Sequence, residues 1–226
     1  EAIAITLYSL LFTFYFIKMN SLTFWSLVVD GGYLMIPMAL LLIMSIYIFV
    51  ERCIVISRAS REDGTFMNRI RDYIHEGDIE SAAALCKKTD SPYSRLILKG
   101  ISRIGRPMND VLIAIENTGN MEVAALGKGF TWLSTTAAGA PMIGFLGTVV
   151  GMIQAFYALA AAGVSANITV LSSGIYQALV TTVAGLVVGI LALFAYNYLT
   201  SRVNRVMRDL EGKTMEFMDL LNEPAL

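Results

Sequence analysis

The chain has 226 residues, of which 56% are hydrophobic and only 15% charged, and its mean hydropathy is +0.62. Soluble domains carry about 25% charged residues, so this composition indicates an integral membrane protein. The formal net charge is −1 and no basic patch with interleaved aromatic residues stands out, so no nucleic-acid partner is expected. Cys53, Cys86 and the sole histidine, His75, show no metal-ligand spacing, so we expect no metal and no cofactor.

The chain begins with an apolar stretch that is short for a membrane span. Residues 2–17 carry no charge before Lys18, yet they lack the basic region and cleavage site of a signal peptide. We interpret residues 1–18 as an apolar N-terminal extension. Either Met19 is the physiological start, which we favour, or the stretch is an extra membrane-contacting helix. Residues 19–51 then comprise a predicted periplasmic N-terminus and transmembrane helix 1.

Residues 52–131 change to the composition of a soluble, helical domain. Gly77 followed by Asp78 predicts a helix end and the N-cap of the next helix. Ser91 and Pro92 predict another helix start, and the apolar spacing extends that helix to Gly105. Pro107 is then expected to begin a further helix.

Residues 129–201 contain no Asp, Glu, Lys, Arg or His. A helix needs about 20 apolar residues to cross a bilayer, so the run predicts two spans. We place transmembrane helix 2 at 132–161, a short periplasmic loop at 162–169 and transmembrane helix 3 at 170–199. Residues 200–226 form a charged amphipathic C-terminal helix that continues the third span.

The orientation follows from arginines near the membrane. Arginines follow spans one and three, whereas the loop between spans two and three has no charge. The positive-inside rule therefore predicts an N-terminus outside, and residues 52–131 and the C-terminus in the cytoplasm.

Small and polar residues recur at helical spacing inside spans two and three. Small residues let helices approach closely within lipid, so we assign a packing role to the glycines of both spans: Gly144, Gly147, Gly151, Gly174, Gly185 and Gly189. Four polar side chains remain as candidates for a functional role: Thr148, Gln177, Thr181 and Thr182. A glutamine amide has four hydrogen-bonding sites to satisfy, so Gln177 is expected to face protein or a wet cavity.

Neither span carries a carboxylate or a histidine, so neither binds and releases a proton by itself. No nucleophile–base pair and no phosphate-binding loop is present either. We therefore expect no enzyme and no catalytic residue. Any proton conduction requires a titrating group from another chain.

The two segments GAPMIGFLGTVVGMIQAF (139–156) and SSGIYQALVTTVAGLVVGILALFAYN (172–197) resemble those of the ExbB/TolQ/MotA family of proton-channel subunits. The span order and the internal helical domain are similar too, and the ExbB group resembles this chain most. The resemblance covers roughly residues 22–222. It implies an all-α membrane protein of three transmembrane helices with long cytoplasmic helical extensions, in the bacterial inner membrane.

The resemblance also implies partners and roles. The chain itself is expected to form a homo-oligomeric ring, which is pentameric in this family and is surrounded by lipid. The other partners are an ExbD-like single-span protein, whose aspartate carries the proton, and a TonB-like protein. Thr148 and Thr182 match pore-lining threonines of the family. Gln177 stands where many members have glutamate, which puts a charge role there in doubt.

Under this hypothesis, outside protons reach the partner aspartate through a path lined by Thr148, Thr181 and Thr182, with Gln177 nearby. Neutralising the carboxylate then lets the partner helices move and energises import across the outer membrane. The alternatives are a TolQ-type subunit of the Tol-Pal envelope system, a MotA-like motor stator, a non-conducting membrane scaffold and an intramembrane enzyme.

Overall fold

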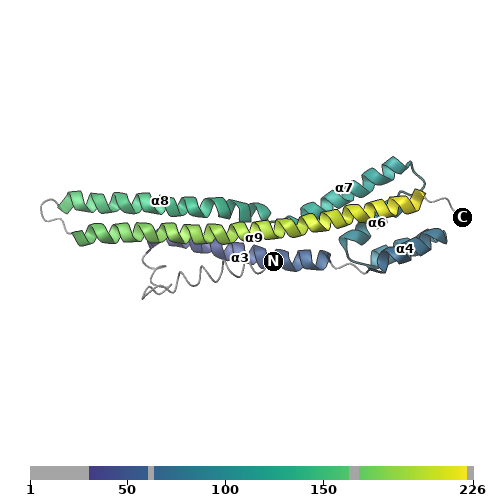
Figure 1. The fold of residues 1–226 in the computed structure, drawn as a ribbon, viewed down its shortest axis with the longest axis horizontal. Coiled ribbons are helices and arrows are strands. Elements are labelled where there is room, and N and C mark those ends of the chain that lie inside the picture. The colour runs from purple at the N-terminus through teal and green to yellow at the C-terminus, as the bar shows by residue number, and fades with distance from the viewer. Residues whose placement is uncertain (1–30, 61–63, 163–167, 223–226) are drawn as a thin grey trace. The chain divides into compact units, whose positions relative to one another are not determined.

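The computed structural model describes residues 31–60, 64–162 and 168–222, and every regular element in these ranges is helical. The elements are η1 (Gly32–Leu34), α3 (Met35–Ala59), α4 (Phe66–His75), α5 (Ile79–Lys88), α6 (Pro92–Ile101), α7 (Met108–Leu126), α8 (Phe130–Ala162) and α9 (Ile168–Asn222). Figure 1 shows their course along the chain. The expectations for residues 1–18, and most of the predicted loop at 162–169, lie outside the described residues.

Among the residues that the structure describes, three helical segments are long and apolar enough to cross a membrane: Gly32–Ala59, Phe130–Ala161 and Leu171–Asn222. This confirms the prediction of an all-α membrane protein with three such helices. Helix α9 is continuous over 55 residues, which at 1.5 Å per residue is about 83 Å of helix. The third apolar segment and the charged C-terminal segment are therefore one helix, as expected.

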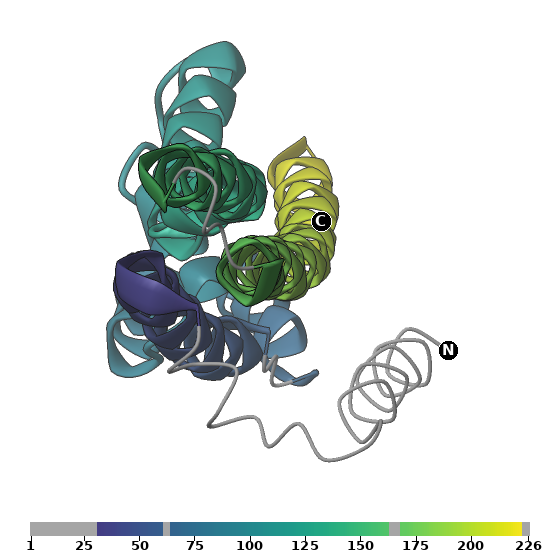
Figure 2. The ribbon, with the colours of Figure 1, turned by 90° about the vertical axis from the view of Figure 1, so that its left-hand side faces the viewer.

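The chain divides into two compact units. The first, which we call the membrane unit, contains the described residues up to Phe49 together with Gly129–Tyr198. Within it α8 and the first part of α9 run side by side (Figures 1 and 2). Helix α3 contacts α9 through Phe49, whose ring lies 6.0 Å from that of Tyr198. Just before α3, Gly32 of η1 adjoins the Gln177 amide of α9.

The second unit, the soluble unit, contains Val50–Lys128 and Leu199–Leu226. Its local signals match the sequence expectations closely. The Asp78 carboxylate caps α5 by accepting a hydrogen bond from the Ser81 amide at 3.0 Å. Ser91 caps α6, with Pro92 in its first turn and Ser94 completing a reciprocal capping box. Gly77 and Gly105 both have positive φ angles, which glycine adopts without strain.

One expected boundary is wrong. Helix α6 ends at Ile101 and not near Gly105. After Ile101 the amides of Arg103 and Ile104 donate to carbonyls only three residues back, those of Gly100 and Ile101, and Gly105 then turns the chain with a φ of +89°. The last turn of α6 packs tightly against α7 and α9, since a Cβ at Gly100 would lie 2.5 Å from the Phe217 ring and 2.8 Å from Ile115. Ile104 follows in the turn and is partly exposed.

Candidate functional site

Helices α8 and α9 meet along a seam of small residues. A Cβ added at Gly185 would lie 2.5 Å from the backbone oxygen of Ala140 and 2.9 Å from the Cα of Gly144. A Cβ at Gly144 would in turn lie 2.9 Å from the Thr181 backbone oxygen. Real Cβ atoms do not sit this close to backbone, so only glycine allows the two helices to approach to this distance.

The seam continues toward both helix ends. Gly151 faces Ala178, and Gly174 faces Ala155, with an added Cβ 2.9 Å and 2.6 Å from the facing Cβ atoms. At the other end Gly189 lies against the Pro141 ring. The glycines that the sequence assigned to packing therefore all lie where α8 meets α9 within one chain.

Two threonine hydroxyls lie together on one side of this seam. The Thr182 hydroxyl donates a hydrogen bond across the helix pair to the Gly144 carbonyl oxygen at 3.0 Å. It lies 3.4 Å from the Thr148 hydroxyl, which donates to the carbonyl of Phe145 in its own helix at 2.5 Å. Both side chains are half-buried, so the pair is accessible from one side of the helix pair.

Thr181 has a different environment although it is the next residue. Its side chain is only 2% exposed, and its hydroxyl donates to the Ala178 carbonyl at 2.7 Å. A Cβ added at Gly147 would lie 2.7 Å from the Thr181 Cβ. These contacts place Thr181 in the helix seam, and its assignment to a proton path stays a prediction.

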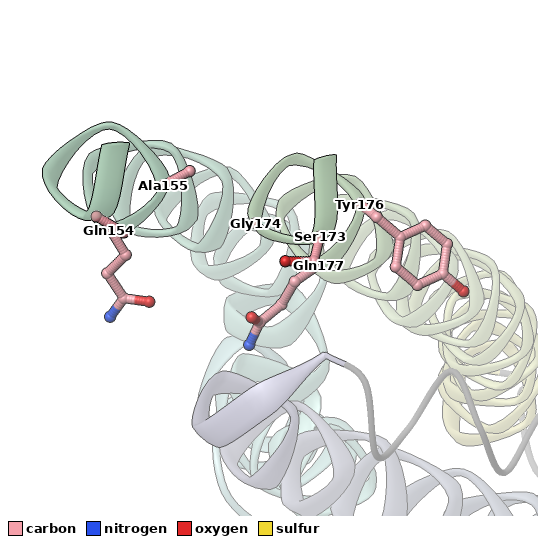
Figure 3. Close-up of a pocket in the computed structure, with 7 residues that line it drawn as sticks. Gln154, Ala155, Ser173, Gly174, Tyr176 and Gln177 are labelled. Atoms are coloured by element: carbon pink, nitrogen blue, oxygen red, sulfur yellow. The ribbon is translucent and has the colours of Figure 1, made fainter. Parts of the chain in front are cut away.

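Gln177 lies on another side of α9. Residues 177 and 182 are five positions apart, which rotates their side chains by about 140° around a helix of 3.6 residues per turn. The Gln177 amide points toward η1, which precedes α3, and adjoins Gly32, whose φ is +68°. Figure 3 shows Gln177 extending from α9 toward that helix, with Gln154 of α8 pointing the same way. The four polar side chains singled out in the sequence thus lie in three places: Thr148 and Thr182 on one side of the seam, Thr181 within it, and Gln177 on another side of α9.

An open groove of about 490 Å³ lies on the Gln177 side, lined by residues of α8 and α9. Its polar side chains include Gln154, Ser173 and Gln177 (Figure 3). Gln154 and Ser173 are not among the polar residues expected from the sequence. Ser173 precedes Gln177 by one helical turn, a spacing that places both on one face and was the available signal. Gln154 follows the apolar residues 149–153, and no polar side chain lies three or four positions before it.

The polar side chains at this seam can form hydrogen bonds, but none of them is an acid or a base that exchanges protons with water. Threonine hydroxyls and glutamine amides both donate and accept hydrogen bonds. The sequence supplies no Asp, Glu, Lys, Arg or His between positions 129 and 201, and the described residues contain no cluster of potential metal ligands. These side chains can therefore orient water or a protonated group, but they cannot carry the proton themselves.

Large apolar side chains remain exposed around the seam. They include Met142, Phe145, Ile153 and Tyr157 of α8 and Leu179, Val183, Leu186 and Ile190 of α9. Exposed apolar surface on this scale requires lipid or other protein chains to cover it. The membrane unit is therefore built to be surrounded on several sides.

Comparison with known proteins identifies the relatives of the chain. The model of the MotA/TolQ/ExbB proton channel family matches residues 88–212. The biopolymer transport protein ExbB of Neisseria meningitidis is 30% identical over 202 residues, covering 81% of this chain and 90% of that protein.

Two further relatives match over shorter parts. The Tol-Pal system protein TolQ of Haemophilus influenzae is 38% identical over 106 residues, covering 47% of this chain and 46% of that protein. An ExbB homolog of Methanothermobacter thermautotrophicus is 31% identical over 149 residues, and this chain covers 52% of its length.

Proposed function

Because this chain belongs to the MotA/TolQ/ExbB proton channel family, we propose that it is the channel-forming subunit of a complex powered by the proton motive force. The family consists of proton-channel energisers and is not a known enzyme family. The apolar helices and the relatives indicate a multi-pass inner-membrane protein. In our proposal an ExbD-like single-span protein completes the channel, and the complex energises a TonB-like protein for import across the outer membrane.

One observation carries this proposal. The Thr148 and Thr182 hydroxyls meet on one side of the α8–α9 pair, within residues 129–201, which contain no carboxylate or histidine. Burying a charge in a membrane is costly, and ionisable groups there serve function in most proteins. A proton path along this face consequently needs its titrating group from the partner, and an aspartate in the ExbD-like helix is that group.

In the proposed cycle, a proton from outside reaches the partner aspartate by way of water ordered at Thr148 and Thr182. Protonation removes the charge and with it the cost of moving the partner helix past apolar residues. The membrane potential adds about 2.3 kcal/mol per charge per 100 mV. We assign the N-terminus to the periplasm, the soluble unit and C-terminus to the cytoplasm, and five copies to the ring.

Valine variants test the path. Valine keeps the shape of threonine and removes its hydroxyl, so Thr148→Val and Thr182→Val should each lower proton flux in proteoliposomes of the reconstituted complex. Thr181→Val is the matched comparison, since its hydroxyl faces the helix seam. Intact flux in the Thr148 and Thr182 variants would refute this path. Equal loss of flux in the Thr181 variant would support the sequence prediction that Thr181 also lines the path.

A second candidate is the TolQ-type function. The TolQ relative is more identical over its matched segment than the ExbB relative. Co-purification from the native membrane separates the two. Recovery of a TolR-like and TolA-like pair, in place of ExbD-like and TonB-like proteins, would assign the chain to the Tol-Pal envelope system.

A further inference from the structure

The soluble unit contains a groove between α7 and α9 that no part of the proposed proton path uses. Its volume is about 230 Å³. Apolar side chains line most of it: Leu96, Leu112, Val123, Met207, Leu210 and Met215. Met215 at its edge is 68% exposed. A groove of this composition offers an apolar surface that a side chain from outside can enter.

The charged groups that line the groove are all acidic. Glu116 stands on α7 and Glu211 on α9, and both are exposed. Two uncharged polar residues also line the groove, Asn120 and Thr214, and the Thr214 hydroxyl already donates to the Leu210 carbonyl at 2.9 Å. The groove thus presents an apolar floor between two carboxylates on opposite walls, with no cation among its lining residues.

We propose that this groove binds a cationic amphipathic helix of a partner protein. A large apolar side chain of that helix enters between Met207 and Met215, and Lys or Arg residues one turn away face Glu116 and Glu211. Helix-in-groove recognition reads apolar anchors at such intervals. Methionine side chains are unbranched and flexible, so they adapt to the shape of the anchor. The inference goes beyond the proton-channel function and does not depend on it.

Binding of a defined peptide to the full-length protein in zwitterionic nanodiscs tests this. The probe is a fluorescein-labelled helical peptide of leucine and lysine, with leucines at every third and fourth position. Its matched controls are the same composition with the leucines scattered around the helix, and a leucine–glutamate version. Fluorescence anisotropy should show binding of the cationic amphipathic peptide and much weaker binding of both controls.

Variants then locate the site. Glu116→Lys combined with Glu211→Lys replaces two attractions by two repulsions and should weaken binding by about tenfold or more. Asp209→Lys combined with Asp219→Lys makes the same charge change at exposed positions of α9 outside the groove, and should leave affinity within about twofold. Met215→Gln should weaken binding without any change of charge. Circular dichroism and gel filtration check that each variant is folded.

Three results would overturn the inference. Equal weakening by the two charge-reversal pairs would mean that the peptide senses only overall charge. Unchanged affinity in Glu116→Lys/Glu211→Lys would place binding elsewhere. Failure of the peptide to bind, with disulfide cross-linking between protomers through Met215→Cys, would mean that a second copy of the chain fills the groove. None of these readouts requires proton flux, so they are separate from a failure of the proposed channel function.

Discussion

The Thr182 hydroxyl donates a hydrogen bond to the Gly144 carbonyl oxygen at 3.0 Å, joining α9 to α8 where small residues bring the two backbones close together. A backbone carbonyl inside a helix already accepts from its own helix, so this second bond requires a hydroxyl within reach. Because Gly144 has no side chain, α9 can approach α8 closely enough for the Thr182 hydroxyl to reach this carbonyl. The close packing of small residues and the placement of the polar pair are therefore one structural feature.

Gly185→Ala should destabilise the protein. The added Cβ would lie 2.5 Å and 2.9 Å from backbone atoms of α8, which cannot move aside as a side chain does. Overpacking of this kind costs about 1–3 kcal/mol. Thermal unfolding in detergent should show a lower midpoint, and Thr182 should lose its bond to Gly144.

Gly139→Ala is the matched control for that variant. It also lies on α8, and a Cβ there would have nothing within 4 Å. Alanine favours a helix over glycine by up to about 1 kcal/mol, so this variant should be neutral or slightly stabilised. A loss equal to that of Gly185→Ala would contradict the assignment of the close contact to the helix seam.

Gly32 and Gln177 should behave as weakly coupled positions. Gly32 has a φ of +68°, and an alanine there costs about 1–2 kcal/mol in backbone strain. The Gln177 amide beside it is the end of a flexible side chain and can swing away. Gly32→Ala should therefore remain destabilising in a Gln177→Ala background, with a coupling energy below about 1 kcal/mol by double-mutant cycle. Complete rescue by Gln177→Ala would show that the contact, and not the backbone, sets the cost.

Arg95 connects α6 to α7 through a two-pronged ion pair. Its Nε and Nη2 donate to the Glu122 carboxylate at 2.7 Å and 2.8 Å, and its Nη1 donates to Asp90 at 2.6 Å. Lysine cannot reproduce this fork. Since the pair is partly exposed, Arg95→Lys should cost about 0.5–1 kcal/mol. Thermal unfolding should show a smaller difference at high salt, and exposed Arg106→Lys should show none.

Cys86 should be unreactive in the folded protein. The side chain is 2% exposed, and burial raises the pKa of its thiol to about 11. The folded state therefore favours the neutral thiol, and its contribution to stability is constant at neutral pH and falls as pH rises from about 9 toward 11. In a Cys53→Ser background, iodoacetamide at pH 8 should label Cys86 only after denaturation. Rapid labelling of the native protein would contradict this burial.

The local structure of the soluble unit was predictable because its signals are local. Asp78, and Ser91 followed by Pro92, satisfy helix-start requirements within a few residues of themselves, and the structure uses them as expected. The exact end of α6 was not predictable: Gly105 does turn the chain, but the α-helical bonds stop earlier, at Ile101. The continuity of α9 followed from uninterrupted helical spacing.

The candidate site was predictable in composition but not in arrangement. Helix α8 is apolar on all sides, so no polar face indicates which way its residues point. On α9, only the contact with α8 separates Thr182, which reaches Gly144, from Thr181, which packs against Gly147. The same lack of a polar face hid Gln154. In the membrane unit, the direction in which each of these side chains points is set by packing against the neighbouring helix.

The central claim is that this chain provides the uncharged part of a proton path whose carboxylate belongs to a partner. Proton flux into proteoliposomes, driven by a potassium diffusion potential, tests it most directly. Three preparations are compared: the chain alone, the complex with its single-span partner, and the complex in which the partner's membrane aspartate is replaced by asparagine. The account predicts flux from the second preparation and background from the other two. Flux from the chain alone, or undiminished flux with the asparagine partner, would contradict it.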